Sequence, residues 1–194
     1  RLPITYDPEA RCPNIVTFLT QLLPDDIATV QEWIGYHLLK SYTYQKCFVL
    51  LGTGSNGKST LLNLLTMFLG QENISARNLY ELVTDKFAKA DLHRKLANIA
   101  ADIGSKELRY TGVFKALTGG DPISAQRKYR DPFKFYNYAK LDFSCNQLPV
   151  SPDESQAFFR RFMIFRFKTR FIDPELYNPE SDQTLQPKDP KILE

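Results

Sequence analysis

The segment GTGSNGKST, residues 52–60, has the composition of a loop that binds the phosphates of a nucleotide. It fits the pattern G-x-x-x-x-G-K-[ST], in which glycines let backbone amides surround the phosphates and the lysine reaches the β- and γ-phosphates. Lys58 is that lysine, and the hydroxyl of Ser59 can ligate Mg²⁺. The sequence therefore predicts that ATP and Mg²⁺ are bound by Gly52, Thr53, Gly54, Ser55, Asn56, Gly57, Lys58, Ser59 and Thr60.

An acid and an amide follow two other apolar runs and could complete a hydrolytic site. Asp102 ends the run in KLANIAADIG and could hold the metal, as a nucleotide hydrolase requires. Asn146 follows the run in LDFSCNQLP and could orient the attacking water. Both residues also suit the turn that ends a strand, which is the plainer interpretation.

Two arginines, Arg160 and Arg161, lie between a short helical stretch and the apolar run FMIFRF. Most arginines are ordinary surface charges. A pair in this position could instead stabilise charge on a phosphoryl group during its transfer.

The segment TGGDPISAQRKYRDPFKF, residues 118–135, predicts a β-hairpin, because apolar and polar residues alternate on either side of a basic stretch. A basic tip that carries an aromatic side chain suits contact with the backbone and bases of single-stranded DNA. A solvated hairpin without a ligand is the alternative on composition alone. The residues predicted to contact DNA are Lys128, Tyr129 and Arg130.

These residues need a scaffold, and the chain predicts an α/β one. Apolar runs at 47–51, 96–101, 140–145 and 162–167 alternate with helical stretches, which indicates a central sheet between helices. Two amphipathic stretches before residue 44 predict a small helical subdomain. We therefore expect an N-terminal leader and helical subdomain at 1–44, a phosphate-loop core at 45–172 and an arm or linker at 173–194.

The composition is that of an ordinary globular protein. Of 194 residues, 43% are hydrophobic and 24% are charged, and a net charge of +3 is too mild to identify a nucleic-acid partner. Three widely spaced cysteines favour a reducing compartment over a disulfide scaffold. No apolar run reaches membrane-spanning length, so we expect no membrane partner.

Taken in order, these motifs resemble the superfamily III helicases, in particular the branch attached to primases in phages, plasmids and large DNA viruses. The resemblance rests on GTGSNGKST, LTGGDPISAQRKYRDPFKF and CNQLP followed by FFRRF, and it extends from about Tyr6 to Phe167. It implies a modified AAA+-type core with a parallel sheet, a β-hairpin insertion and a helical subdomain before it.

The resemblance also implies a function and a role for each motif. It implies an ATP-dependent replicative DNA helicase that forms a homo-hexameric ring in the cytoplasm of a host cell, with the hairpin following single-stranded DNA and a primase domain elsewhere in the parent protein. Lys58 and Ser59 would bind phosphate and Mg²⁺, Asp102 would be the acid of the Walker B motif, Asn146 the sensor and Arg161 the finger. The family commonly has two adjacent acids where this chain has Ala101 and Asp102, so Glu107 is a second candidate acid.

Three other functions remain open from the residues alone. One is a packaging or loading ATPase that grips DNA without unwinding it. Another is a P-loop kinase of small molecules, which would need neither DNA nor a ring. A scaffold that does not hydrolyse nucleotide is the third.

Overall fold

The computed structural model describes residues 2–101, 103, 111–148, 151–180, 182, 184–189 and 192. The helices in this part of the chain are α1 (Pro13–Leu22), α2 (Ile27–Tyr36), α3 (Lys58–Leu69), α4 (Leu79–Thr84), α5 (Lys86–Ala90), α6 (Thr111–Leu117) and α7 (Gln156–Phe159), with 3₁₀ turns at Gln71–Asn73 and Pro174–Leu176. The strands are β1 (Cys47–Leu51), β2 (Ile74–Ser75), β3 (Ala97–Ala101), β4 (Pro122–Ala125), β5 (Phe133–Tyr136), β6 (Lys140–Cys145), β7 (Phe162–Arg166), β8 (Arg170–Ile172) and β9 (Leu185–Pro187).

Five of these strands form one parallel sheet in the order β2-β3-β6-β1-β7. Strand β1 lies between β6 and β7, and four of its five residues are buried. Its sequence CFVLL is a continuous apolar run, as expected for a parallel strand covered on both faces. The predicted fold class, a parallel sheet flanked by helices with a hairpin insertion, is confirmed.

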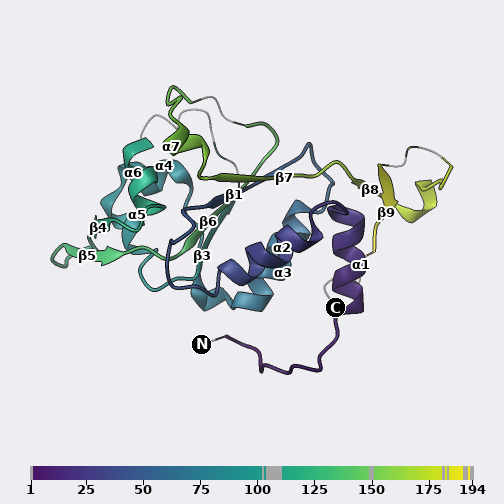
Figure 1. Cartoon of the computed structure of the whole chain (residues 1–194), viewed down its shortest axis with the longest axis horizontal. Helices are drawn as coiled ribbons and strands as arrows, with labels where there is room; N and C mark the ends of the chain where they lie inside the picture. Colours follow the sequence, from purple (N-terminus) through teal and green to yellow (C-terminus); the bar gives the residue numbers. More distant parts are fainter. Residues whose placement is uncertain are drawn as a thin grey trace.

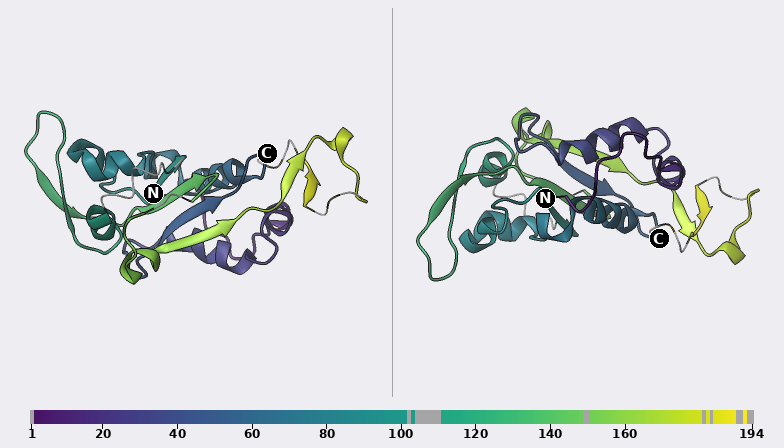
Figure 2. Two further views of the ribbon diagram at one scale, coloured as in Figure 1. Left: turned by 90° about the horizontal axis from the view of Figure 1, so that it is seen from above. Right: turned by 90° about the horizontal axis from the view of Figure 1, so that it is seen from below.

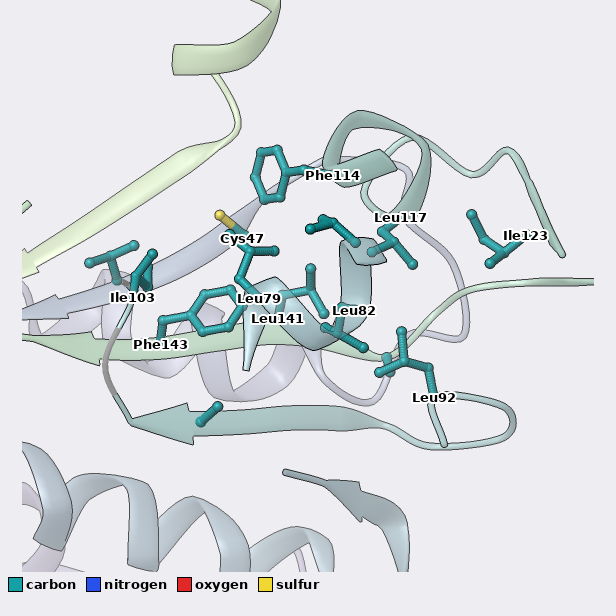
Figure 3. Close-up of a cluster of buried hydrophobic side chains, with 14 of the residues drawn as sticks. Cys47, Leu79, Leu82, Leu92, Ile103, Phe114, Leu117, Ile123, Leu141 and Phe143 are labelled. Carbon is teal, nitrogen blue, oxygen red and sulfur yellow. The ribbon is translucent and has the colours of Figure 1, made fainter. Parts of the chain in front are cut away.

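Alternate residues of the central strands enter two separate hydrophobic clusters. Val49, Leu141 and Phe143 pack with side chains of α4, α6 and α7 in one cluster, which Figure 3 shows. Phe48 and Leu50 belong to the other cluster, together with residues of α1, α2 and α3. This division follows from the two-residue repeat of a strand, and it anchors the N-terminal helices against the same sheet that carries the phosphate loop.

The predicted hairpin is the two-stranded antiparallel sheet of β4 and β5, in which Ala125 pairs with Phe133. It projects from one end of the molecule, and the small sheet of β8 and β9 lies at the other end (Figure 1). The two views of Figure 2 show the same separation. No helix in the described ranges is long and apolar enough to cross a membrane.

Candidate nucleotide-binding site

The loop between β1 and α3 follows a path that requires its glycines. Gly54 and Gly57 have φ angles of 112° and 79°, and Ser55 is also left-handed at 47°. A Cβ atom on Gly52 would lie 2.0 Å from Nδ2 of Asn56. The loop therefore closes tightly over its own first residue, and Gly57 then begins the helix by accepting a hydrogen bond from Leu61 N–H at 2.9 Å.

Lys58 lies inside this loop rather than in solvent. Its side chain is only 8% exposed, and Nζ donates hydrogen bonds to the carbonyl oxygen of Gly52 at 2.6 Å and to Oδ1 of Asn56 at 2.9 Å. Both partners are neutral, and burial lowers the pKa of Lys58. The Nδ2 group of Asn56 is buried without a hydrogen-bond partner in the described part of the chain. The loop thus presents a desolvated ammonium group and an unused amide donor, which are the groups that a polyphosphate would complement.

The strand pairing brings Asn146 to the same edge of the sheet as the loop. The N–H of Gly52 donates to the carbonyl oxygen of Cys145 at 3.1 Å, and the exposed Asn146 follows directly. Ligands of open parallel sheets bind at this edge, outside the carboxyl ends of the strands. Ser59 is exposed in the first turn of α3.

Strand β3 ends at Ala101, which pairs with Ser144 of β6. Asp102 comes next in the sequence, and both Asp102 and the rival acid Glu107 lie outside the described residues. Their assignment as the metal-binding acid therefore stays a prediction. Among the described residues, Ser59 supplies a hydroxyl group, which is a ligand that Mg²⁺ accepts beside nucleotide phosphates.

A cavity of about 320 Å³ adjoins the phosphate loop on the side of the C-terminal arm. Its walls come from α1, the loop and the arm, and they include Phe18, Gln21, Gly57, Thr60, Phe171, Lys188 and Ile192. Strand β8, which leads into the arm, is fixed to the loop, because the N–H of Phe171 donates to the carbonyl oxygen of Ser55 at 2.7 Å. The aromatic and aliphatic walls suit a flat heterocyclic ring, and the polar atoms nearby suit its exocyclic groups.

Sequence reasoning missed this cavity beside the phosphate loop. The prolines and charges after residue 173 favoured an arm or linker, and no pattern in that stretch indicates contact with a loop more than one hundred residues earlier. The one available signal is the apolar pair Phe171 and Ile172, which continues after β7 and would suit a further short strand.

The two arginines of FFRRF have different surroundings. Arg161 is 7% exposed, and its Nε donates to Oγ1 of Thr118 at 3.0 Å while Nη1 contacts the carbonyl oxygen of Ala157. Burial, followed by the neighbouring Arg160, lowers the pKa of Arg161. Arg160 is exposed and contacts the side chain of Gln45. Arg161 therefore ties the start of β7 to the end of α6, whereas Arg160 is available at the surface.

The hairpin tip is a turn in which Arg130 N–H donates to the carbonyl oxygen of Arg127 at 3.1 Å. Tyr129 is fully exposed and left-handed, with φ at 60°. Lys128 and Arg130 are exposed on either side of it. The predicted DNA-contacting residues thus lie together at the far end of the molecule from the phosphate loop (Figure 1).

This fold and loop define an α/β protein of the phosphate-loop class. Residues 50–161 match the model of a protein family described as a family of unknown function, DUF5906, and the chain belongs to that family. The match covers the end of β1, the phosphate loop, the hairpin and both arginines.

Three viral proteins are similar to the chain in sequence. "Putative helicase L207/L206" of Acanthamoeba polyphaga mimivirus is 31% identical over 177 residues, which are 82% of this chain and 17% of the viral protein. "Putative helicase 121R" of Invertebrate iridescent virus 3 and "Putative helicase 022R" of Frog virus 3 are each 26% identical over 71% and 73% of the chain. The chain spans about a sixth of the length of these relatives.

Solved structures with the same fold include the C-terminal region of NrS-1, with a TM-score of 0.65, 17% identity and coverage of 92% of this chain and 42% of that one. A structure of JCV helicase with a bound small molecule has a TM-score of 0.54 and 16% identity, and the match covers 79% of this chain and 44% of that one. At these identities the likeness concerns the fold. Together with the viral relatives, it confirms the predicted resemblance to superfamily III helicases of large DNA viruses.

Proposed function

We propose that this chain is the ATP-hydrolysing motor of a DNA helicase that moves along single-stranded DNA. The viral relatives are named as helicases, and the chain carries a phosphate loop after β1 of the central sheet and a basic hairpin, β4 and β5, before its strand β6. Lys58 carries the proposal, because a buried ammonium group among neutral oxygens is complemented by the charge of a nucleotide polyphosphate.

In this proposal the loop residues 52–60 hold the phosphates of ATP, and Ser59 with Asp102 holds Mg²⁺. The metal would neutralise charge on the phosphates. The base would lie in the cavity between α1 and the arm, against Phe18 and Phe171. Asn146, next to the start of the loop, would orient the attacking water.

The ring assembly and the primase partner are part of the same proposal and rest on the resemblance. In a hexamer, an arginine of one subunit would act on ATP held by its neighbour. Arg161 is the candidate by its place in the motif, but its guanidinium group bonds within its own subunit. The exposure of Arg160 favours that residue as the one able to reach a neighbour.

The decisive experiment measures ATP hydrolysis with and without single-stranded DNA. We expect DNA to stimulate hydrolysis by the wild-type protein, and Lys58→Ala to abolish both nucleotide binding and hydrolysis. Lys40→Ala, which removes an exposed lysine from a distant surface, is the matched control and should behave as wild type. Hydrolysis that is indifferent to DNA would instead indicate a small-molecule kinase, and DNA-stimulated hydrolysis without strand displacement would indicate a packaging or loading ATPase.

The acid of the site can be tested separately. Asp102→Asn should keep nucleotide affinity and nearly abolish turnover, because the metal and water would lose their carboxylate. If turnover persists in Asp102→Asn and disappears in Glu107→Gln, the acid is Glu107.

A further inference from the structure

A groove runs along the base of the hairpin, away from the phosphate loop. Two cavities of about 480 and 240 Å³ share His93 and Arg127 in their walls and therefore form one continuous depression. The first extends to the edge strand β2 and to Lys95, and the second extends towards the hairpin tip through Arg130.

Basic side chains that lack acidic partners dominate this groove. Arg77 is neutralised by Asp91, with Nη2 2.6 Å from the carboxylate, and also contacts Glu81. Lys95, Arg127 and Arg130 form no ion pair within the described part of the chain, although Nζ of Lys95 contacts the carbonyl oxygen of Glu72. Asp91, which is paired with Arg77, and Asp131 also line the two cavities, but the basic side chains outnumber them, and a groove with a net positive charge attracts a polyanion.

His93 lies at the centre of the groove, where the two cavities meet. Its ring packs edge-on against Phe133 and Phe135, at centroid distances of 5.1 and 5.3 Å. Burial, together with the positive charges of Arg94 and Arg127, lowers the pKa of His93. These contacts fix the groove to strand β5 of the hairpin. An elongated ligand bound in the groove would therefore lead directly to the exposed hairpin tip.

The edge strand β2 supplies the other end of the groove. Because β2 has a neighbour on one side only, its outer backbone groups are not used by the sheet. The hydroxyl group of Ser75, in the wall of the groove, is buried without a hydrogen-bond partner among the described residues. Hydroxyl and backbone donors commonly join lysine and arginine in contacts to nucleic-acid phosphates.

We infer that this groove binds the sugar-phosphate backbone of the single-stranded DNA whose bases meet the hairpin tip. The inference rests on the proposed function and adds a second contact surface to it, formed by Lys95, Arg127, Arg130 and His93. Several cations spaced along an open, elongated groove match successive phosphates of a strand better than one compact anion.

The test compares two double variants that remove the same charge. Lys95→Gln/Arg127→Gln changes the groove, and Lys40→Gln/Lys168→Gln changes exposed lysines elsewhere. Binding of a fluorescent oligothymidine to the whole 194-residue chain is measured by anisotropy over a range of salt concentrations. Each lost phosphate contact should lower the slope of log affinity against log salt by about 0.7, so the groove variant should lose about 1.4 in slope and about 25-fold in affinity at ~0.1 M salt.

The outcomes separate this inference from the proposed function. If both double variants bind DNA alike, the groove is not a DNA site, whatever the ATPase does. If wild-type protein hydrolyses ATP but does not bind oligothymidine, the proposed helicase function fails as well. Polyglutamate that competes as well as oligothymidine at equal charge would show a general polyanion surface and overturn the assignment to DNA. If the groove variant loses its cooperative thermal transition, Arg127→Gln alone decides, since the loss of its exposed side chain should lower the slope by about 0.7.

Discussion

Replacement of Asp142 should reveal how strongly the helical subdomain is bound to the sheet. The carboxyl group is fully buried in β6, where it accepts a hydrogen bond from Trp33 Nε1 and is hydrogen-bonded to His37 Nε2, both at 2.8 Å. The other ring nitrogen of His37 lies 2.8 Å from the carbonyl oxygen of Trp33, which can only accept, so Nδ1 carries a hydrogen. Asp142→Leu would leave two buried polar groups of α2 without partners.

The expected loss follows from that count. A buried donor without a partner costs about 1–3 kcal/mol, so Asp142→Leu should lower the free energy of unfolding by about 2–6 kcal/mol. Asp142→Asn has nearly the same shape and can still accept from Trp33 and donate to the Nε2 atom of a neutral His37. Because it exchanges charge-assisted bonds for neutral ones, its loss should be only about 1 kcal/mol.

Urea unfolding followed by circular dichroism measures both losses, and Trp33→Phe completes a double-mutant cycle with Asp142→Leu. The double variant should lose less than the sum of the single variants, because the indole donor and its acceptor are removed together. Equal losses for Asp142→Leu and Asp142→Asn, with no coupling to Trp33→Phe, would refute the reasoning.

Three further outcomes follow from the structure. Burial lowers the pKa of Lys140 to about 8, so the unfolded chain binds this proton more tightly, and this group alone should raise the free energy of unfolding by about 2 kcal/mol between pH 8 and 10. Because burial raises the pKa of Cys47, which acts in the opposite direction, the measurement is the difference between urea titrations of the wild type and of Lys140→Met, which should grow by that amount. Tyr129→Ala should weaken oligothymidine binding by about 1–3 kcal/mol without altering nucleotide affinity, as equilibrium titration of each ligand would show. The arginine finger is tested by mixing Arg160→Ala or Arg161→Ala with Lys58→Ala. The variant that lacks the arginine acting on a neighbouring subunit should be inactive alone and should regain ATPase activity in mixed rings. If neither mixture recovers activity, action between subunits is excluded.

The sequence predicted the elements that have a strong local signal. Strand β1 is an uninterrupted apolar run of five residues, and the loop after it carries a glycine and lysine spacing that few other structures need. The hairpin was equally predictable, because its alternation fixes which residues face inward, and Ile123, Ala125 and Phe135 are indeed buried.

Contacts between distant segments were not predictable in the same way. The amphipathic stretch that forms α2 predicts only a packed helix, yet His37, directly after it, bonds to a carboxylate 105 residues away in β6. Nothing local to either segment indicates the partner. The cavity wall formed by Phe171 and the groove around His93 escaped prediction for the same reason, since each joins segments that only the tertiary fold brings together.

Strand β6 gives the two ends of the molecule a direct mechanical connection. It begins at Lys140, shortly after β5 of the hairpin ends, and it finishes at Cys145, whose carbonyl oxygen holds the first residue of the phosphate loop. Between these points Asp142 is hydrogen-bonded to Trp33 of α2 and to His37 directly after it, and β6 pairs with β3 over residues 140–144 and with β1 over residues 142–145. A strand so constrained cannot stretch or slip by one residue without breaking these bonds, so we expect a displacement at Asn146 to move β6 together with its neighbours, and the hairpin that precedes β6 with them.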